Sequence, residues 1–378
     1  MGVDTTIPSA GPGGIRRGAS VRRDPAEAAA ELAGRLGAAD LKALVFFASP
    51  AYDLEALGRE IGARFACPAA GCTTAGEIVS PEGYLENGLV GAGFAAPDIA
   101  MEPVFIPSLE AFVQNSDGIR PEGDGDGTNT FGLLLLDGMS MLEERVAAAL
   151  SRELRGMPLI GGSAGDGLKF QHTHVYHGGR FHENAAVLAR FRTRRPFRAF
   201  HIQHFEPTGT KLVITEAQVE ARMVSEINGY PAAEEYARIV GVAPEALTPE
   251  VFAAFPVMLR IGGEYYVRSI QKANADGSLT FFCAIDNGLV LTLGRASSLA
   301  DNLREELAAL ERELGGLELV IGCDCILRRL EIQQRGCGAA VREVLARHPF
   351  VGFSTYGEQF GGLHVNQTLT GLALGAAP

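Results

Sequence analysis

The sequence predicts an α/β fold with α+β character, in which helices flank mixed β-sheets built from duplicated modules. Three observations carry this prediction. Apolar strand-like runs alternate with helix-like segments, hairpin signals occur in the middle of the chain, and one local motif appears three times. Because the first two copies start about 90 residues apart, which exceeds the length of a solenoid repeat, the motif indicates duplicated supersecondary modules.

The repeated motif is a proline, a short apolar step, a glycine, a hydroxyl residue, a second glycine and an acid. Its copies run from Pro68 to Glu77, from Pro158 to Asp166 and from Pro349 to Glu358, the second being one residue shorter. Glycine permits positive φ and the close approach of another group, while the hydroxyl and the acid can bind the amides of a turn. The motif therefore predicts either a buried turn that serves folding or a cradle for an anion or carboxylate.

The first half of the chain is expected to begin with a disordered segment over residues 1–22. A helix should start at Pro25, because Asp24 can cap its first turn, and should end near Leu36. A linker of glycines and aspartates runs from Glu122 to Asn129, between the first two modules. The other elements expected here are strands over 42–48, 66–72 and 131–136 and helices over 53–63 and 140–154.

The sequence after the second copy of the motif is rich in strand signals. Gly178-Gly179 predicts a two-residue hairpin loop between the strands on either side. Asn228-Gly229 predicts a turn that leads into a helix, so a domain boundary is expected between 225 and 240. The further elements expected are strands over 171–177, 180–188, 199–205, 211–217, 257–261, 265–270, 279–285, 288–293 and 318–325 and helices over 298–314 and 336–347.

Composition limits the classes of function. The chain has 378 residues, of which 47% are apolar, and a net charge of −12, which argues against nucleic acid or an anionic membrane as the partner. No apolar run is long enough to span a bilayer, and the N-terminal stretch lacks the apolar region of an export signal. Six cysteines in such a chain are typical of reduced thiols, so we expect a cytoplasmic protein.

The histidines give the sharpest candidate for cofactor chemistry. Four of the eight lie around the predicted hairpin: His172, His174, His177 and His182. Pairing across Gly178-Gly179 places His177 opposite Arg180, and the same register puts His182 on the same face. One histidine suffices as an axial ligand of haem iron, whereas most histidines on strands are ordinary surface residues. Both interpretations stay open at this point.

Nucleophilic and metal chemistry have weaker support. Cys72 could be a nucleophile, but the matching positions of the motif carry Gly162 and Phe353, so the motif requires no thiol. Cys323 and Cys325 share one strand face, yet the CxxC pairs typical of structural zinc are absent from the sequence. We therefore assign neither a catalytic residue nor a metal site.

These residues resemble the FIST family. Gly71 to Ile78 and Ile160 to Asp166 look like signature blocks of the FIST N-terminal domain. Glu226 to Gly229, Cys325 to Arg328 and Gly352 to Glu358 look like those of the FIST C-terminal domain. The blocks occur in the expected order, and the resemblance covers residues 40 to 373. It implies an N-terminal domain over 23–228 and a C-terminal domain over 229–378.

The resemblance implies an intracellular ligand sensor of signal transduction and no enzyme. Stand-alone members similar to this chain are bacterial haem proteins that sense nitric oxide and regulate a separate histidine kinase, which makes haem the expected cofactor. The candidate haem ligands are His177, His182, His204 and His364.

Two alternatives remain. A haem-free sensor would bind an amino acid or another small metabolite at the glycine turns, through Thr74, Ser163, Thr355 or Glu358. A hydrolase would use Cys72 or a hydroxyl of a turn as its nucleophile. Neither alternative includes nucleic acid or a membrane as a partner.

Overall fold

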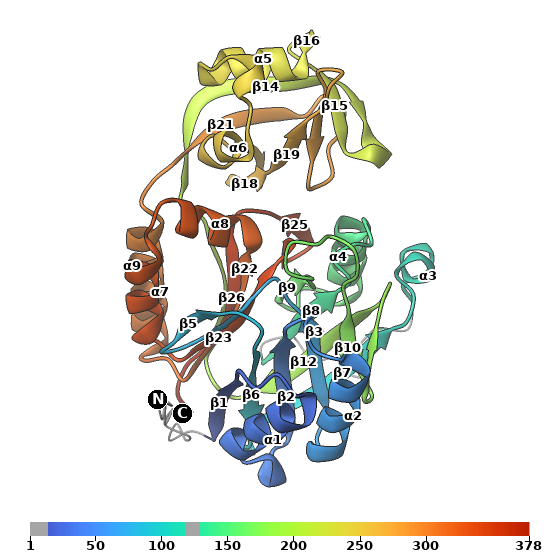
Figure 1. Ribbon diagram of the computed structural model, residues 1–378, viewed down its shortest axis with the longest axis vertical. Helices are drawn as coiled ribbons and strands as arrows, with labels where there is room; N and C mark the ends of the chain where they lie inside the picture. Colours follow the sequence, from blue (N-terminus) through green and yellow to red (C-terminus); the bar gives the residue numbers. More distant parts are fainter. Residues whose placement is uncertain (1–13, 118, 120–128, 378) are drawn as a thin grey trace.

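A computed structural model describes residues 14–117, 119 and 129–377 of the chain (Figure 1). These residues form a body of three β-sheets with helices on its outside and a separate domain with its own sheet, drawn at the top of Figure 1. Helices and strands alternate along the chain, and the strands form mixed sheets. This arrangement confirms the predicted α/β fold with α+β character.

The body repeats one module three times: an edge strand, a helix, two parallel strands joined by a crossover, a short hairpin and a closing antiparallel strand. Module 1 consists of β1 (Ile15–Ser20), α1 (Pro25–Leu36), β2 (Ala43–Ala48), α2 (Leu54–Arg64), β3 (Ala69–Thr73), β4 (Glu77–Val79), β5 (Gly83–Leu85) and β6 (Leu89–Phe94). Module 2 consists of β7 (Ile99–Ile106), α3 (Leu109–Gln114), β8 (Thr130–Leu136), α4 (Glu143–Glu153), β9 (Leu159–Ser163), β10 (Val175–His177), β11 (Arg180–His182) and β12 (Ala186–Thr193). Module 3 consists of β13 (Phe197–Ile202), α7 (Leu299–Leu314), β22 (Leu319–Cys325), α8 (Ile326–Gln334), α9 (Gly338–Ala346), β23 (Phe350–Thr355), β24 (Glu358–Phe360), β25 (Leu363–Val365) and β26 (Leu369–Leu374).

Each module donates its hairpin to the sheet of another module. The β4–β5 hairpin of module 1 pairs with β23 of module 3, the β24–β25 hairpin of module 3 pairs with β9 of module 2, and the β10–β11 hairpin of module 2 pairs with β3 of module 1. The three sheets consequently share one strand order, β1-β6-β2-β3-β10-β11, β7-β12-β8-β9-β24-β25 and β13-β26-β22-β23-β4-β5. The donation is cyclic, so none of the three modules completes its sheet alone.

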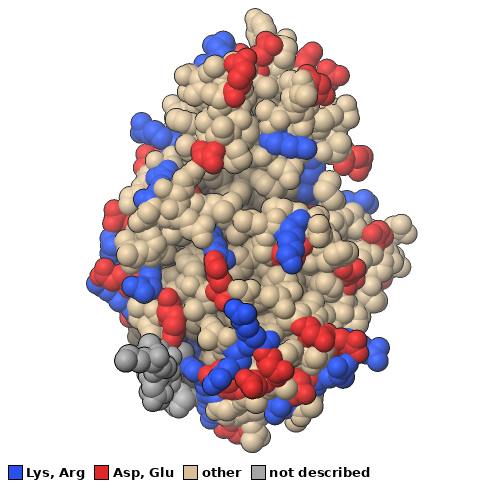
Figure 2. All heavy atoms as spheres, in the orientation of Figure 1, with Lys and Arg blue, Asp and Glu red and all other residues tan. Residues whose placement is uncertain are grey.

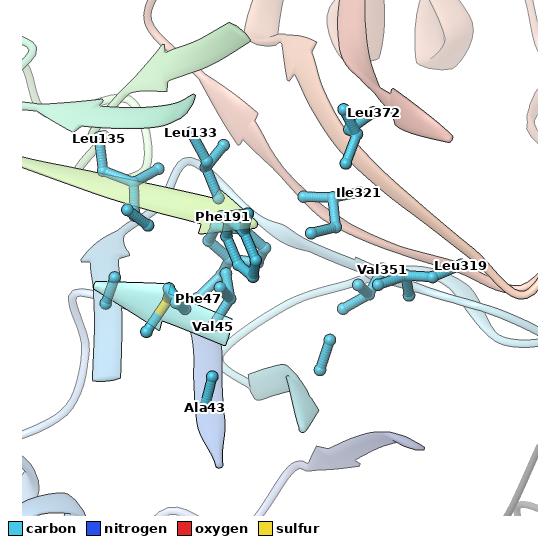
Figure 3. Packing of buried hydrophobic residues seen from close by; sticks show 14 of the residues in the cluster. Ala43, Val45, Phe47, Leu133, Leu135, Phe191, Leu319, Ile321, Val351 and Leu372 are labelled. Atoms are coloured by element: carbon cyan, nitrogen blue, oxygen red, sulfur yellow. The ribbon is translucent and has the colours of Figure 1, made fainter. Parts of the chain in front are cut away.

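The inner faces of the three sheets enclose one shared core. Phe47 of β2, Leu133 of β8 and Ile321 of β22 point into it from the three modules (Figure 3). Phe47 also stacks on Phe353 with ring centroids 4.5 Å apart. Alternate residues of the central strands, such as Phe46, face outward onto the helices. Both faces of each sheet are therefore buried, which explains the nearly continuous apolar runs of β2 and β8.

The separate domain is inserted into module 3, between β13 and α7. It contains β14 (Phe205–Gln218), β15 (Met223–Ile227), β16 (Tyr230–Pro231), α5 (Ala232–Val240), α6 (Pro249–Ala254), β17 (Val257–Ile261), β18 (Glu264–Arg268), β19 (Ile270–Ala273), β20 (Leu279–Phe281) and β21 (Val290–Ala296). Its strands form one sheet in the order β18-β17-β21-β14-β15-β20-β19, and β16 pairs with β15. Tyr236 of α5 and Phe252 of α6 pack into its own apolar core. We call it the inserted domain.

The prediction of disorder over residues 1–22 is wrong where the structure describes them. Residues 15–20 form β1, which pairs along its whole length with β6. Ile15 reaches the shared core, and Arg16 forms an ion pair with Asp40. The strand is held by long-range pairing with β6, so its own short polar sequence gave little sign of it. Residues 1–13 and residues 122–128 of the expected linker lie outside the described residues.

Several local predictions are confirmed. Asp24 caps α1 by accepting hydrogen bonds from the amides of Ala26 and Glu27, each at 2.9 Å. The hairpin register is also the predicted one, with His177 opposite Arg180. The expected division at 228/229 lies in the turn between β15 and β16, inside the sheet of the inserted domain. That division remains a prediction.

Candidate functional site

The three copies of the motif meet in the body. Each copy is the segment through which the chain leaves one sheet and enters the next, so the donated hairpins bring the copies side by side. The backbone bonds between them are Ala75 N to Ser354 O at 2.9 Å, Ser354 N to Gly76 O at 2.7 Å, Gly165 N to Thr73 O at 3.0 Å and Ser163 N to Gly357 O at 2.8 Å. The motif thus has a folding role at the junction of the modules.

The first and third copies form the same turn. In each, the threonine hydroxyl donates to the acid three residues later and accepts from the amide of the glycine between them. Thr355 donates to Glu358 at 2.9 Å and accepts from Gly357 at 2.8 Å. Thr74 and Glu77 are joined in the same way. The hydroxyl and the acid therefore fix the turn, as one of the two interpretations of the motif predicts.

The two turn acids are buried and their pKa values are raised. Burial raises the pKa of Glu77 to about 7, although hydrogen bonds from Thr74 and the amide of Gly88 oppose the shift. Burial raises the pKa of Glu358 to about 8, against bonds from Thr368 and Thr355. At pH 7 the Glu77 carboxyl is thus about half protonated and the Glu358 carboxyl is largely protonated, because desolvation disfavours the charged form.

The second copy differs, because Asp166 replaces glutamate. Burial alone would raise the pKa of Asp166, but hydrogen bonds from Tyr356 and from three backbone amides outweigh it and lower this pKa. Those amides belong to Phe170, Gln171 and His172. Asp166 is therefore charged and orders the loop that follows β9.

A cleft of about 370 Å³ opens beside the first turn. We call it the Arg329 cleft. It is bordered by the first turn, by the loop after Asp166, by the segments after β2 and β5, and by α8. Its lining residues are Ser49, Pro50, Ala51, Thr74, Ala75, Gly76, Glu77, Glu86, Asn87, Asp166, Gly167, Leu168, Lys169, Ile326, Arg329, Leu330 and Gln333.

Gly76 determines where the Arg329 guanidinium lies. Gly76 has φ of +134°, and a Cβ built on it would lie 1.6 Å from Nη1 of Arg329. Nη1 donates to the carbonyl of Ala75, and Nη2 donates to Oε1 of Glu86 at 2.9 Å. The Glu86 side chain is 72% exposed while that of Arg329 is 10% exposed. A carboxylate is thus already paired with Arg329, in a position that a ligand carboxylate could take.

The cleft combines charge with apolar surface. Arg329 and the exposed Lys169 supply cations, and Leu168, Ile326 and Leu330 supply aliphatic walls. A guanidinium binds a carboxylate through two parallel N–H donors, which gives both energy and orientation. The lining is therefore suited to a small carboxylic acid with an apolar part.

Of the four residues predicted to bind a small ligand, only Thr74 lines this cleft. Thr355 and Glu358 bind each other in the third turn, and Ser163 accepts a hydrogen bond from Gln359 at 3.0 Å. All four are buried. Arg329, Lys169 and Glu86 were missed by the sequence analysis, since nothing near them in the chain indicates that they face the first turn.

The four candidate haem histidines do not form one site. His177 and His182 lie together against Phe105, with ring centroids 4.7 and 4.6 Å from it. His204 is buried, donates from Nε2 to Glu331 at 2.9 Å and accepts at Nδ1 from Arg328 at 3.2 Å. His364 accepts at Nδ1 from Gln359 at 3.2 Å.

The surroundings of each histidine decide whether its ring can serve as an iron ligand. Both ring nitrogens of His204 are engaged in a buried network, so coordination would break it. His182 Nε2 contacts the carbonyl of His177 at 3.3 Å. His177 fits best, because its Nδ1 has no hydrogen-bond partner among the described residues and its ring is held flat on Phe105. Neither the Arg329 cleft nor a second cleft of about 450 Å³ beside Asp98 contains any of the four.

Cys72 is a poor nucleophile in this fold. It is fully buried in the shared core, and burial, with the nearby Cys323 thiol adding to it, raises its pKa well above the ordinary value. A reactive cysteine needs a lowered pKa and access to substrate. Within residues 14–117, 119 and 129–377, no group of three or more His, Cys, Asp or Glu side chains is placed to hold a metal ion.

Comparison with known families gives two matches. The FIST N domain model matches residues 42–230, and the FIST C domain model matches residues 232–361. No curated protein sequence matches the chain. Among the described residues, no helix is both long and apolar enough to cross a membrane.

Proposed function

The chain belongs to the FIST family, and on that premise we propose that it senses a small apolar carboxylic acid, such as an apolar amino acid, in the Arg329 cleft. FIST domains sense small ligands in signal transduction. The observation that carries the proposal is the pairing of the nearly buried Arg329 guanidinium with the exposed carboxylate of Glu86. A ligand carboxylate replaces Glu86 and leaves that side chain in water, so the exchange keeps a charged partner on Arg329.

The rest of the cleft supports the same ligand class. Leu168, Ile326 and Leu330 bury an aliphatic or aromatic side chain, and a volume of about 370 Å³ accommodates one amino acid. Lys169 adds long-range attraction for the carboxylate.

A partner protein would detect the bound ligand through the rim of the cleft. Leu168 and Leu330 line the cleft and are 54% and 37% exposed, so an occupied cleft presents a different surface from an empty one. We propose that a separate signalling protein, such as a histidine kinase, binds this rim. The chain acts in this account as a binding protein rather than as an enzyme.

A thermal-shift screen with the common amino acids tests the proposal. We expect L-leucine and other apolar amino acids to raise the melting temperature, since a ligand at 100 times its Kd stabilises the fold by about 2.7 kcal/mol. Arg329→Met should abolish the shift. Arg347→Met removes an exposed arginine at the C-terminal end of α9, outside the lining of the cleft, and should leave the shift unchanged. An unchanged melting temperature with every amino acid would contradict the proposal.

A haem-based gas sensor is the second candidate, and His177 is the observation that favours it. Its Nδ1 is buried without a partner among the described residues, and its ring packs flat on Phe105. Haem bound there would supply iron with an open position for nitric oxide. His177 would hold the iron, Phe105 would keep the imidazole in place, and His182 would lie beside them.

An absorption spectrum of the protein reconstituted with haem tests this candidate. It predicts one haem per chain and a Soret band that shifts with nitric oxide. His177→Ala should remove the band, while His172→Ala, at an exposed position in the same segment, should keep it. Weak, substoichiometric binding that no histidine variant changes would exclude the candidate.

A further inference from the structure

The inserted domain meets the body along a polar seam. Arg222 of the inserted domain donates to Glu143 and Glu144 at the start of α4, each at 2.8 Å. Arg268 donates from Nη1 to the carbonyl of His364 in the β24–β25 hairpin at 2.8 Å. We call this region the seam and define it by Glu143, Glu144, Arg222, Arg268, Gln359, His364 and Asn366. It lies where the inserted domain covers α4 and β25 in Figure 1.

Side-chain atoms of the seam are buried without partners. Asn366 has no exposed surface, yet neither Nδ2 nor Oδ1 has a hydrogen-bond partner among the described residues. Oε1 of Gln359 and Nε of Arg268 are also buried and unpartnered there. A native fold rarely leaves such groups unsatisfied, because each has lost its bonds to water and gained none. Their grouping in one place points to a missing bonding partner.

The residues with unpartnered atoms are neighbours. His364 connects two of them, since its carbonyl accepts from Arg268 and its Nδ1 accepts from Gln359. Gly357 lies between His364 and Asn366, because a Cβ built on it would be 2.2 Å from Cε1 of His364 and 3.2 Å from Nδ2 of Asn366. The side chains thus form one chain of neighbours where the third turn, the donated hairpin and the inserted domain meet.

We propose that the seam is a second ligand site, separate from the Arg329 cleft, and that it binds a small molecule bearing a primary carboxamide. The amide of Asn366 offers one donor and one acceptor side by side. A primary carboxamide carries the complementary pair and satisfies both atoms, whichever way the Asn366 amide is oriented. The remaining donor, Arg268 Nε, donates to a carbonyl or carboxylate oxygen of the ligand. The remaining acceptor, Gln359 Oε1, accepts from an N–H group of the ligand.

This inference does not depend on the proposed function. The two sites share none of their defining residues, and the seam lies against the third turn rather than the first. Because the seam joins the inserted domain to the body, a molecule bound there adds contacts between the two. Binding is therefore expected to tie the inserted domain to the body.

Titration calorimetry with L-glutamine tests the proposal, and L-glutamate serves as the matched acid. We expect glutamine to bind with a measurable heat and glutamate to bind at least tenfold more weakly. Asn366→Leu, which keeps the branching of the side chain and removes both polar atoms, should weaken glutamine binding at least tenfold. Its melting temperature should equal or exceed that of the wild type, since the substitution removes unsatisfied polar atoms.

Two control variants separate the seam from the cleft. Asn302→Leu makes the same substitution at another side chain with an unpartnered atom, on α7, and should leave glutamine binding unchanged. Arg329→Met should also leave it unchanged. The proposal is overturned if glutamine produces no heat with the folded wild type, if glutamate binds equally well, or if Asn366→Leu binds as the wild type does. The first of these results would mean that water alone fills the seam.

Discussion

The first and third turns have the same sequence pattern and the same internal hydrogen bonds, but they face different surroundings. At the first turn, the space left by Gly76 is filled by the guanidinium of Arg329, at the edge of an open cleft. At the third turn, the space left by Gly357 is filled by the imidazole of His364, under the inserted domain. The threonine and the acid thus serve folding in both copies, whereas the space beside the glycine is where the copies have acquired different chemistry.

The charge in the two regions differs as well. On the face in Figure 2, acidic and basic side chains are interspersed over the surface, which is consistent with recognition by local groups rather than by a large field of one sign. Arg329 is paired with one exposed carboxylate. The seam pairs Arg222 with two largely buried carboxylates, Glu143 and Glu144. The cleft can exchange its partner with a ligand, whereas the seam must open to admit one.

Removal of the turn acids should give the largest effects. Glu358→Ala leaves Thr368 and Thr355 without their buried partner, and we expect a loss of about 3 kcal/mol in the free energy of unfolding. Glu77→Ala should lose somewhat less, because the first turn lies beside a cleft that water can enter. Urea denaturation measures both. A larger loss for Glu77→Ala would contradict the difference that we infer between the turns.

Alanine at the two glycines should separate the turns further. Gly76→Ala imposes a side chain at φ of +134° and displaces Arg329, so we expect a loss of about 2 kcal/mol and loss of ligand binding in the cleft. Gly357→Ala meets side-chain atoms of His364 and Asn366 and no backbone atom, and should lose about 1 kcal/mol. Melting curves and the amino-acid thermal shift report both changes. Equal losses would mean that positive φ contributes nothing at Gly76.

The raised pKa values predict a pH dependence with a defined sign. The unfolded chain releases the protons of both acids near pH 4.5, whereas the native state holds them up to about pH 7 at Glu77 and about pH 8 at Glu358. The native state therefore binds more protons in this window, and the free energy of unfolding falls as pH rises, by up to about 1.4 kcal/mol per pH unit for each group.

The variant Glu358→Gln separates the contribution of Glu358 to this pH dependence from that of Glu77. Glu358→Gln replaces a largely protonated carboxyl with an amide of the same shape, so it should flatten the part of the decline between about pH 7 and pH 8. Denaturation at several pH values measures the slopes. A variant slope equal to that of the wild type would show that Glu358 is ionised in the native state.

The smallest predicted effect is at Glu86. Glu86→Gln removes the charge that competes for Arg329, and we expect the ligand to bind about threefold more tightly, since an exposed pair contributes less than about 1 kcal/mol. Glu343→Gln, in an exposed ion pair of α9, is the control and should change nothing. Calorimetry distinguishes the two, and weaker binding by Glu86→Gln would mean that Glu86 helps to hold the ligand.

The sequence predicted those features that depend on neighbours in the chain. The cap of α1 by Asp24, the hairpin around Gly178-Gly179 and the three turns follow from local chemistry. β1 and the cyclic exchange of hairpins could not be predicted, because they depend on pairing between segments far apart. The site was hidden for the same reason, since Arg329 reaches the carbonyl of Ala75 across 254 residues.

A crystal structure with the amino acid that stabilises the protein most would test the central claim most directly. The account predicts the ligand carboxylate within hydrogen-bond distance of Nη2 of Arg329, with Glu86 displaced into solvent and the ligand side chain against Leu168 and Leu330. A ligand bound away from Arg329, with the pair between Arg329 and Glu86 intact, would contradict it.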